Sequence, residues 1–310
     1  MSDDFAQHLI VPFAQSTGDG WLQAVTPLKL KNLEQLLRGM KLVGTDPGAA
    51  DSLSPPHERV WAKALGMPTV DGLIPWAALD AKAKPRVGWA VITPCHWAMG
   101  REHATLTDPA TLDLNEAESR TLLAAMQPYF ATEGITLHYQ QPTRWLAAGD
   151  VFTSLPTASP DRVLGRNVDR WLPASKQIKL LQNEMQMLLY THPVNDERTA
   201  RGQRSVNSFW VSGSGALTET ATGNPNINLL RSLAPSAFAS DWAAYAQAWA
   251  QLDTTDVAAL LAQQNSGKTV RISLCGESNS VTLQSVPRTL LSRIKGAFTP
   301  LLCVYLLKQL

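Results

Sequence analysis

The sequence predicts an α/β protein in which a mixed sheet is flanked by helices. Short runs rich in β-branched and aromatic residues alternate along the chain with longer segments that carry apolar residues at helical spacing. The 310 residues, 45% of them hydrophobic, can bury a sizeable core and suit one large or two ordinary domains. No internal repeat or low-complexity tract interrupts the alternation.

The N-terminal part supplies the first elements of this pattern. The run HLIVPFA, residues 8–14, predicts a buried strand because it is apolar and is followed by the turn-like STGDG. Apolar residues at helical spacing predict a helix within 30–40. Ser54, followed by two prolines, predicts the start of a second helix that ends near Gly66. The run RVGWAVITP predicts the next strand.

The remaining elements follow from caps and periodicity. Asn115 and Glu118 form a capping box that begins a helix over 116–130. Further strands are expected at 134–140 and 206–212, the second closed by a Gly213–Gly215 loop, with an amphipathic helix over 175–190 between them. The C-terminal part predicts, in order, helices at 240–252 and 255–264, strands at 269–275 and 280–286, and a last amphipathic segment.

Composition restricts the class of protein. A net charge of +1 gives no general attraction for nucleic acid. The three cysteines are odd in number and far apart, which is typical of a reducing cytoplasm. The most apolar segment, AFTPLLCVYLLKQL, is too short to span a bilayer, and the N-terminus has no signal-peptide pattern. We therefore expect a cytoplasmic protein without nucleic-acid or membrane partners.

Arginines and a serine-glycine run are the candidates for anion binding. A planar guanidinium donates two parallel hydrogen bonds to a phosphate or carboxylate, and helical spacing would place each set of arginines on one face. The alternative is a solvated face paired with nearby acids. The two sets are Arg162, Arg166 and Arg170, and Arg198, Arg201 and Arg204. Ser212 to Gly215 could offer backbone N–H groups to an anion or form an ordinary turn.

Residues of metal-ligand type are densest around residue 100. No H-x-x-x-H or H-E-x-x-H spacing occurs in the chain, so structural roles are expected for this cluster. Its members are Cys95, His96, Glu102, His103 and Asp108. Neither a metal nor another cofactor is expected. The aromatic stripe of Trp242, Tyr245 and Trp249 is expected to pack in a core.

Residues 192–215, HPVNDERTARGQRSVNSFWVSGSG, resemble the archaeal-type cofactor-independent phosphoglycerate mutases of the alkaline-phosphatase-like superfamily. The residues that match are His192, Pro193, Asn195, Arg198, Gly202, Asn207, Trp210, Gly213 and Gly215. The resemblance extends over roughly 90–215, which corresponds to the inserted substrate domain of the mutases. It implies a discontinuous α/β core domain of residues 1–90 together with 216–310, and an inserted α/β unit of residues 91–215.

The whole chain is also similar to the RpfE-type regulatory proteins, a bacterial family. The similarity is carried by several motifs in the same order: SPPHERVWAKALG, DGLIPWAAL, PCHWAMGREH, LPTASPDRVLGRNVDRWLP, LQNEMQMLLYTHPVNDER and VNSFW. It implies a regulatory role and, with it, a regulatory protein partner.

The chain departs from the mutase pattern at its metal ligands. The mutase resemblance implies an Asp-Gly pair after the first strand, where this chain has Phe13 and Ala14. It also implies histidines in the C-terminal half, yet His192 is the last histidine. A two-metal site clamps the attacking and leaving oxygens, so loss of its ligands should abolish that chemistry. The alternative is an active mutase, or another phosphate-ester metalloenzyme, whose ligands would come from the cluster near residue 100.

We therefore expect a phosphoglycerate-mutase-like regulatory protein without the two-metal site, a pseudoenzyme that binds a small phosphorylated or carboxylated metabolite. A protein-interaction module that exposes some of its tryptophans is a third possibility. Arg198 should matter most among its neighbouring arginines, because it occupies the arginine position of the resemblance, whereas Arg201 and Arg204 should be exposed and replaceable. The expected ligand-binding residues are Arg166, Asn195, Arg198, Arg201, Arg204, Asn207, Ser212 and Ser214.

Overall fold

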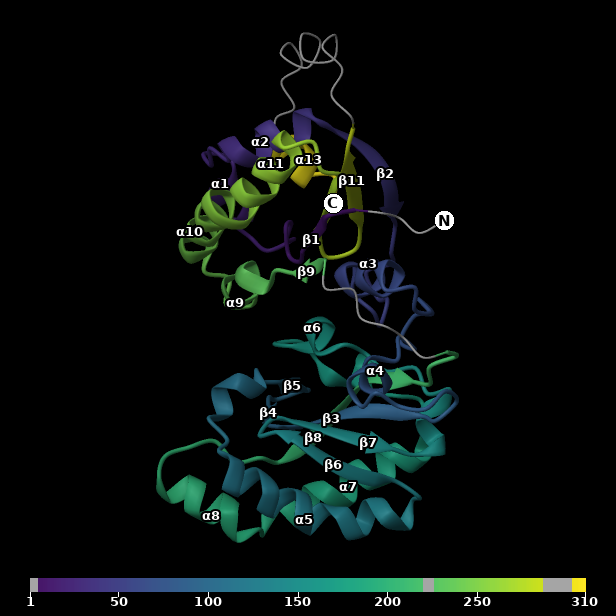
Figure 1. The fold of residues 1–310 in the computed structure, drawn as a ribbon. Helices are drawn as coiled ribbons and strands as arrows, with labels where there is room; N and C mark the ends of the chain where they lie inside the picture. The colour runs from purple at the N-terminus through teal and green to yellow at the C-terminus, as the bar shows by residue number, and fades with distance from the viewer. Residues whose placement is uncertain (1–4, 220–225, 287–302) are drawn as a thin grey trace. The chain divides into compact units, whose positions relative to one another are not determined.

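The computed structural model describes residues 5–219, 226–286 and 303–310. They belong to two compact units, which are considered separately (Figure 1). The first unit comprises Met1–Asp51, Pro55–Leu65 and Gly223–Leu310, and the second comprises Ser52–Ser54 and Gly66–Thr222. From the sequence, the boundaries between the core domain and the inserted unit were expected at residues 90 and 216. No helix among the described residues is both long and apolar enough to cross a bilayer.

A five-stranded mixed sheet organises the first unit. Strand β1 (Gln7–Val11) lies between β10 (Val270–Cys275) and β9 (Ile227–Leu229) and runs parallel to both. Strands β11 (Ser280–Ser285) and β2 (Met40–Asp46) extend the sheet in antiparallel fashion. The first strand therefore pairs with strands from the C-terminal part of the chain.

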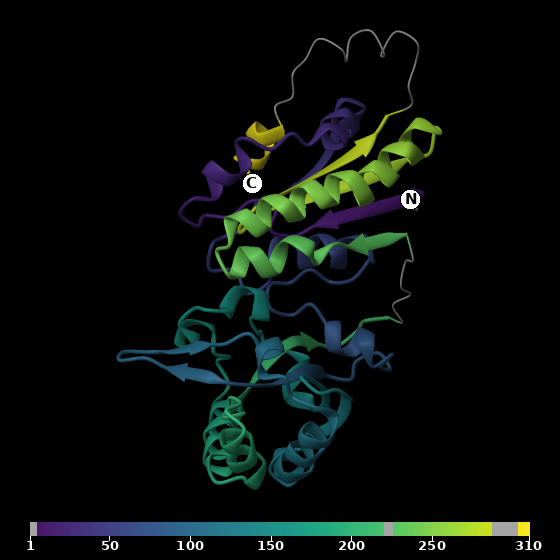
Figure 2. The same cartoon turned by 90° about the vertical axis from the view of Figure 1, so that its left-hand side faces the viewer.

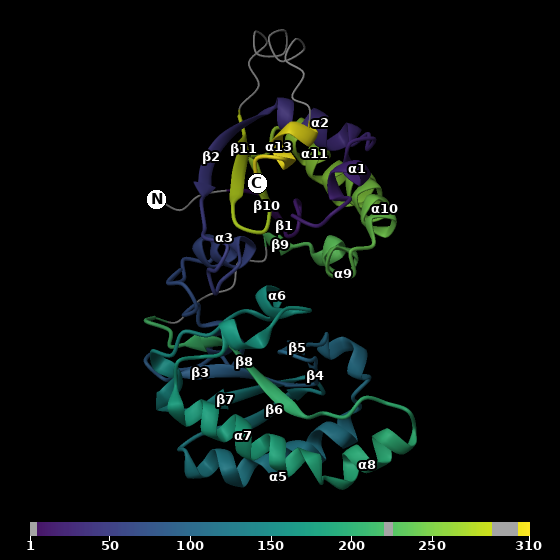
Figure 3. The ribbon, with the colours of Figure 1, turned by 180° about the vertical axis from the view of Figure 1, so that it is seen from behind.

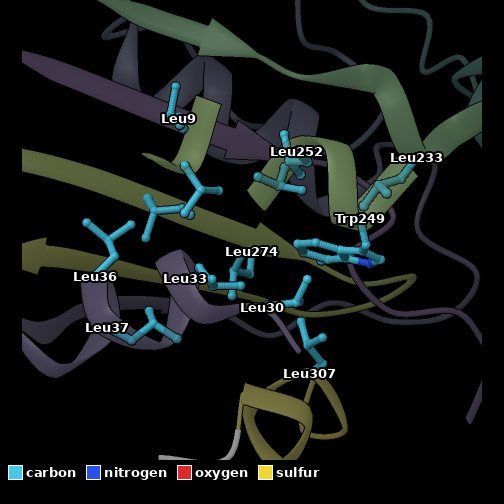
Figure 4. Packing of buried hydrophobic residues seen from close by; sticks show 14 of the residues in the cluster. Leu9, Leu30, Leu33, Leu36, Leu37, Leu233, Trp249, Leu252, Leu274 and Leu307 are labelled. Carbon is cyan, nitrogen blue, oxygen red and sulfur yellow. The ribbon is translucent and has the colours of Figure 1, made fainter. Parts of the chain in front are cut away.

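Helices cover both faces of this sheet. Leu9 and Val11 of β1 face the larger core, and Ile10 between them contacts Val60 on the opposite face, because side chains alternate along a strand. Figure 4 shows Leu9 and Trp249 within the larger core, which confirms that the aromatic stripe packs. Figure 2 shows the long helix that contributes Trp249 running along the sheet. The helices are α1 (Trp21–Val25), α2 (Lys31–Arg38), α3 (Pro56–Ala64), η4 (Arg231–Leu233), α9 (Ala234–Phe238), α10 (Trp242–Leu252), the π-turn η5 (Asp253–Val257), α11 (Ala258–Asn265) and α13 (Cys303–Leu307).

The second unit contains a four-stranded antiparallel sheet in the order β6-β7-β3-β8. Neighbouring residues of β8 face opposite sides of the sheet, since Phe209 packs against the long helices α5 and α7 while Trp210 packs in a second cluster on the other face. Figure 3 shows α5, α7 and α8 on one side of the sheet and α6 on the other. The strands are β3 (Trp89–Cys95), β6 (Thr136–Gln141), β7 (Arg144–Ala148) and β8 (Ser208–Gly215), with a separate hairpin of β4 (Trp97–Met99) and β5 (Ala104–Leu106). The helices are α4 (Trp76–Asp80), η1 (Pro109–Leu112), α5 (Glu116–Thr132), η2 (Asp150–Thr153), α6 (Pro160–Val163), η3 (Val168–Trp171), α7 (Lys176–Tyr190) and α8 (Pro193–Ala200).

The predicted fold class, a mixed α/β protein with a mixed sheet flanked by helices, is confirmed. Two local predictions were wrong. Ser54 does not cap α3, whose N-cap is Pro55, because the Ser54 hydroxyl instead accepts a hydrogen bond from Gly72 N. Gly213 to Gly215 continue β8 instead of closing it. The last amphipathic segment lies partly outside the described residues.

Candidate functional site

The segment that begins at Thr191 opens with a capped helix. His192 is the N-cap of α8, and its Nδ1 accepts from Val194 N at 3.2 Å. Pro193 has no N–H, and the backbone N–H groups of Asn195 and Asp196 both donate to His192 O. Burial lowers the pKa of His192, and the neighbouring carboxylate of Asp196 opposes this shift. The N–H groups at the start of this helix therefore have partners within the protein.

Arg198 lies inside the second unit, with no exposed surface. Its Nη1 donates to Glu118 Oε2 at 2.6 Å, its Nε donates to Arg204 O at 2.9 Å, and its Nη2 donates to Leu112 O. Glu118 also accepts from Arg201 and, through the confirmed capping box, from Asn115 N. The three nitrogens of Arg198 thus tie α8 to α5, to η1 and to the chain that enters β8.

The other predicted arginines do not share this position. Arg201 is the C-cap of α8 and half-exposed, and Arg204 is exposed beyond the helix, as expected for both. Arg166 is exposed in the 164–167 segment, which bridges to β5. The preceding helix, α6, lies on the opposite side of the sheet from α8 (Figure 3). The helical spacing predicted for Arg162, Arg166 and Arg170 was wrong, because Gly165 adopts a φ of +69° between α6 and η3.

Two asparagines fasten neighbouring segments together. Asn195 is buried and donates through Nδ2 to Leu189 O and Val206 O, while its Oδ1 accepts from Val206 N at 2.8 Å. Asn207 accepts from Trp97 N at 2.7 Å and donates to Trp97 O at 3.0 Å. Both side-chain amides are therefore engaged in positioning α8, β8 and β4.

Ser212 and Ser214 are buried within β8. The Ser214 hydroxyl donates to Leu155 O and Gly72 O and lies 2.8 Å from Thr157 Oγ1. The sequence suggested a loop with free N–H groups at this place. A strand results instead because Gly215 pairs with Trp89 of β3, while Gly213, with a φ of +57°, allows the irregularity in that pairing.

A hollow of about 460 Å³ opens beside this segment, at the junction of α7 and α8. Asn195 and Asn207 line it, whereas the predicted arginines and serines do not. The full lining comprises Trp97, Met99, Gln186, Leu189, Tyr190, Asn195, Asp196, Thr199, Ser205 and Asn207. Its volume lies within the range of small-ligand pockets, about 300–1,000 Å³. The sequence gives no signal that Trp97, Met99 or Tyr190 would line a hollow, since hydrophobic residues at helix and strand positions ordinarily indicate a core.

A second candidate position is the end of β1 in the first unit, where ligands bind in many open α/β sheets. Phe13 occupies it with a φ of +57°, a conformation that is rare for a bulky residue. The Phe13 ring lies 4.8 Å from the ring of Phe238 and 5.5 Å from that of His57, measured between centroids. Phe13 O accepts from Tyr245 Oη at 2.6 Å. Aromatic side chains therefore fill this strand end.

The residues of metal-ligand type near residue 100 are dispersed. Cys95 is buried in β3, where burial raises the pKa of its thiol, and His96 Nδ1 lies 2.9 Å from Ser205 O. Asp108 caps η1 by accepting from Ala110 N. Glu102 and His103 are exposed in the β4–β5 turn. Within residues 5–219, 226–286 and 303–310, no group of three His, Cys, Asp or Glu side chains could hold a metal ion.

Solved structures similar to this chain include two archaeal proteins. One is a cofactor-independent phosphoglycerate mutase from Thermoplasma acidophilum, with 13% identity, a TM-score of 0.37, and coverage of 98% of this chain and 99% of that chain. The other is the PH0037 protein from Pyrococcus horikoshii, with 10% identity, a TM-score of 0.44, and coverage of 91% and 87%. No protein-family model and no curated protein sequence matches the chain. Membership of the RpfE-type family stays a prediction.

Proposed function

We propose that this chain is a non-catalytic regulatory protein related in design to the phosphoglycerate mutases, without their two-metal site. The resemblance of residues 192–215 supports the relationship, and the RpfE-type motifs support the regulatory role. The chain would bind its ligand without transferring a phosphoryl group.

The filled end of β1 carries this proposal. Two-metal phosphoryl transfer needs anionic ligands around both ions, held open to substrate. The Phe13 ring instead packs against the rings of His57 and Phe238 at the strand end, and the carbonyl of Phe13 accepts from Tyr245. His57 is 1% exposed. These side chains do not fit a pair of divalent ions.

The cluster near residue 100 gives no substitute. The buried Cys95 thiol, the His96 ring against Ser205 O and the Asp108 cap are each committed to a local structural contact. The rival function, an active mutase, would need these residues to gather around ions, and their positions on β3, on the following loop and on η1 oppose that.

An activity assay tests the proposal. The purified chain should interconvert 2-phosphoglycerate and 3-phosphoglycerate no faster than buffer, with Mn²⁺, Zn²⁺ or Mg²⁺ added, while an active cofactor-independent mutase serves as control. Turnover on the order of 1 to 10 per second, the range of ordinary enzymes, would overturn the proposal.

Binding of a small anionic metabolite stays a prediction. Fewer arginines are available to donate hydrogen bonds to it than the sequence suggested. All three guanidinium nitrogens of Arg198 are engaged, and Arg201 is tied to Glu118. Arg166, Arg201 and Arg204 are the exposed members of the predicted set, so a small anion would have to meet one of them at the surface.

A further inference from the structure

We propose that the hollow at the α7–α8 junction binds an organic cation, meaning an ammonium or guanidinium group carried on an apolar stem. The hollow is lined by residues of the second unit alone, from β4, α7, α8 and the chain before β8 (Figure 3). This assignment does not depend on whether the chain is catalytic, and it differs in charge from the expected metabolite.

The charge of the lining supports a cation. Asp196 is the one carboxylate among the residues that line the hollow, and no lysine, arginine or histidine is among them. The Asp196 side chain is exposed and makes no hydrogen bond or ion pair with any part of the chain that the structure describes. His192 lies close enough to interact electrostatically, but its lowered pKa keeps that ring neutral near pH 7. The carboxylate is therefore available to a ligand.

Several donors that an anion would need are already used. The first N–H groups of α8 donate to His192, both N–H groups of the Asn195 amide donate to backbone carbonyls, and the Asn207 amide donates to Trp97 O. Thr199 Oγ1 donates to Asn195 O. Gln186 keeps an amide that can both donate and accept. The donors that remain carry no positive charge, so the carboxylate of Asp196 sets the charge preference of the hollow.

The rest of the lining suits an apolar stem and a positive head. Tyr190 and Met99 are 83% and 79% exposed, so neither serves the core. Trp97, by contrast, is nearly buried and contributes a fixed aromatic wall. Aromatic faces attract ammonium and guanidinium groups electrostatically, and thioethers adapt to irregular apolar ligands. A carboxylate together with aromatic rings matches the chemistry of a lysine or arginine side chain, or of a free amine of similar size.

Calorimetric titration of the full chain tests the assignment with matched probes. N-acetyl-lysine methylamide and N-acetyl-arginine methylamide carry the cation, N-acetyl-norleucine methylamide carries a similar stem without charge, and 3-phosphoglycerate carries the opposite charge. We expect saturable binding of the two cationic probes in the millimolar range, weaker binding of the norleucine probe, and no displacement of the cations by 3-phosphoglycerate. Free agmatine and a short lysine-containing peptide then distinguish a small-molecule source from a protein source, and tight binding of either supports the site.

Two variants locate the binding. Asp196→Asn should weaken the cationic probes about two- to fivefold, the value of an exposed ion pair, and should leave the norleucine probe unchanged. Tyr190→Ala should weaken them by a similar factor of about two to five, the value of an exposed cation–π contact. Glu197→Gln and Tyr129→Ala are the controls, because these exposed residues do not line the hollow. Equal binding of the lysine and norleucine probes, or an unchanged affinity in both hollow variants, would overturn the proposal.

Discussion

The end of β1 in the first unit and the arginine-rich segment in the second depart from mutase-like expectations in different ways. At the end of β1 the residue types themselves differ, because Phe13 stands where an acidic ligand is implied, and aromatic rings fill the space. In the second unit the expected residue types are present, but Arg198 and Asn195 turn inward and bind the protein itself. A matching residue therefore indicates which functional group is present at a position. Only the packing shows whether that group contacts a ligand or another part of the protein.

The largest expected effect concerns the inward-facing arginine. Arg198→Ala removes one partner of a buried ion pair, leaves Glu118 without its buried arginine, and leaves two backbone carbonyls without the donor that Arg198 supplies. We expect a loss of about 3–5 kcal/mol in the free energy of unfolding. Urea denaturation followed by circular dichroism measures it. The control, Arg204→Ala, removes an exposed side chain and should change stability by no more than about 0.5 kcal/mol. Normal stability of Arg198→Ala with lost binding of 3-phosphoglycerate would instead make Arg198 a ligand donor and break the comparison.

A second prediction concerns pH and the buried His8 of β1. Burial first, and Arg271 second, lower the pKa of His8 to about 4 from a model-compound value of 6.5. The unfolded chain binds a proton in this window and the folded chain does not, so stability is fully present above pH 6.5 and is lost as the pH falls towards 4. The loss attributable to His8 is about 3 kcal/mol. Urea denaturation between pH 7.5 and pH 4.5 should show a steep fall in the wild type and a shallower one in His8→Gln. Identical slopes would contradict the assignment.

The smallest expected effect concerns the backbone conformation of Phe13, just after the end of β1. Phe13 has a φ of +57°, a conformation that costs an L-residue about 1–2 kcal/mol more than it costs glycine. Phe13→Ala and Phe13→Gly both lose the contacts with His57 and Phe238, so Phe13→Gly should be the more stable of the two by about 1 kcal/mol. The matched control is Leu22 in α1, half-exposed, where alanine should be favoured over glycine by about 1 kcal/mol. The same ranking at both positions would show that Phe13 is not held in the left-handed region.

Local signals in the sequence predicted much of the fold. The capping box at Asn115, the helical stripe of α7 and the apolar first strand each depend on residues a few positions apart. Strand β7 was missed because its sequence, RWLAA, has no β-branched residue and no alternation. Strand β2 is mostly exposed and includes Gly44, so it lacks the apolar pattern of a strand.

The candidate site depends on contacts that sequence spacing does not encode. The partner of Arg198 lies 80 residues earlier in the chain, and the two side chains meet only because α8 packs beside α5. Glu118 was recognised as a capping residue, but its second role requires the folded unit. The hollow likewise combines β4 with α7 and α8, and its aromatic lining is indistinguishable in sequence from core residues. Of the predicted site residues, Asn195 and Asn207 alone line it.

Metal stoichiometry tests the central claim most directly, namely that the end of β1 holds an aromatic cluster in place of a two-metal site. The purified chain is dialysed against Mn²⁺ and then against Zn²⁺, and the bound metal per chain is measured by mass spectrometry, with Phe13→Ala beside the wild type. We predict substoichiometric metal in both proteins, because removal of the ring creates no carboxylate or imidazole ligand. About two equivalents of bound metal per wild-type chain, the number that a two-metal site requires, would contradict the account.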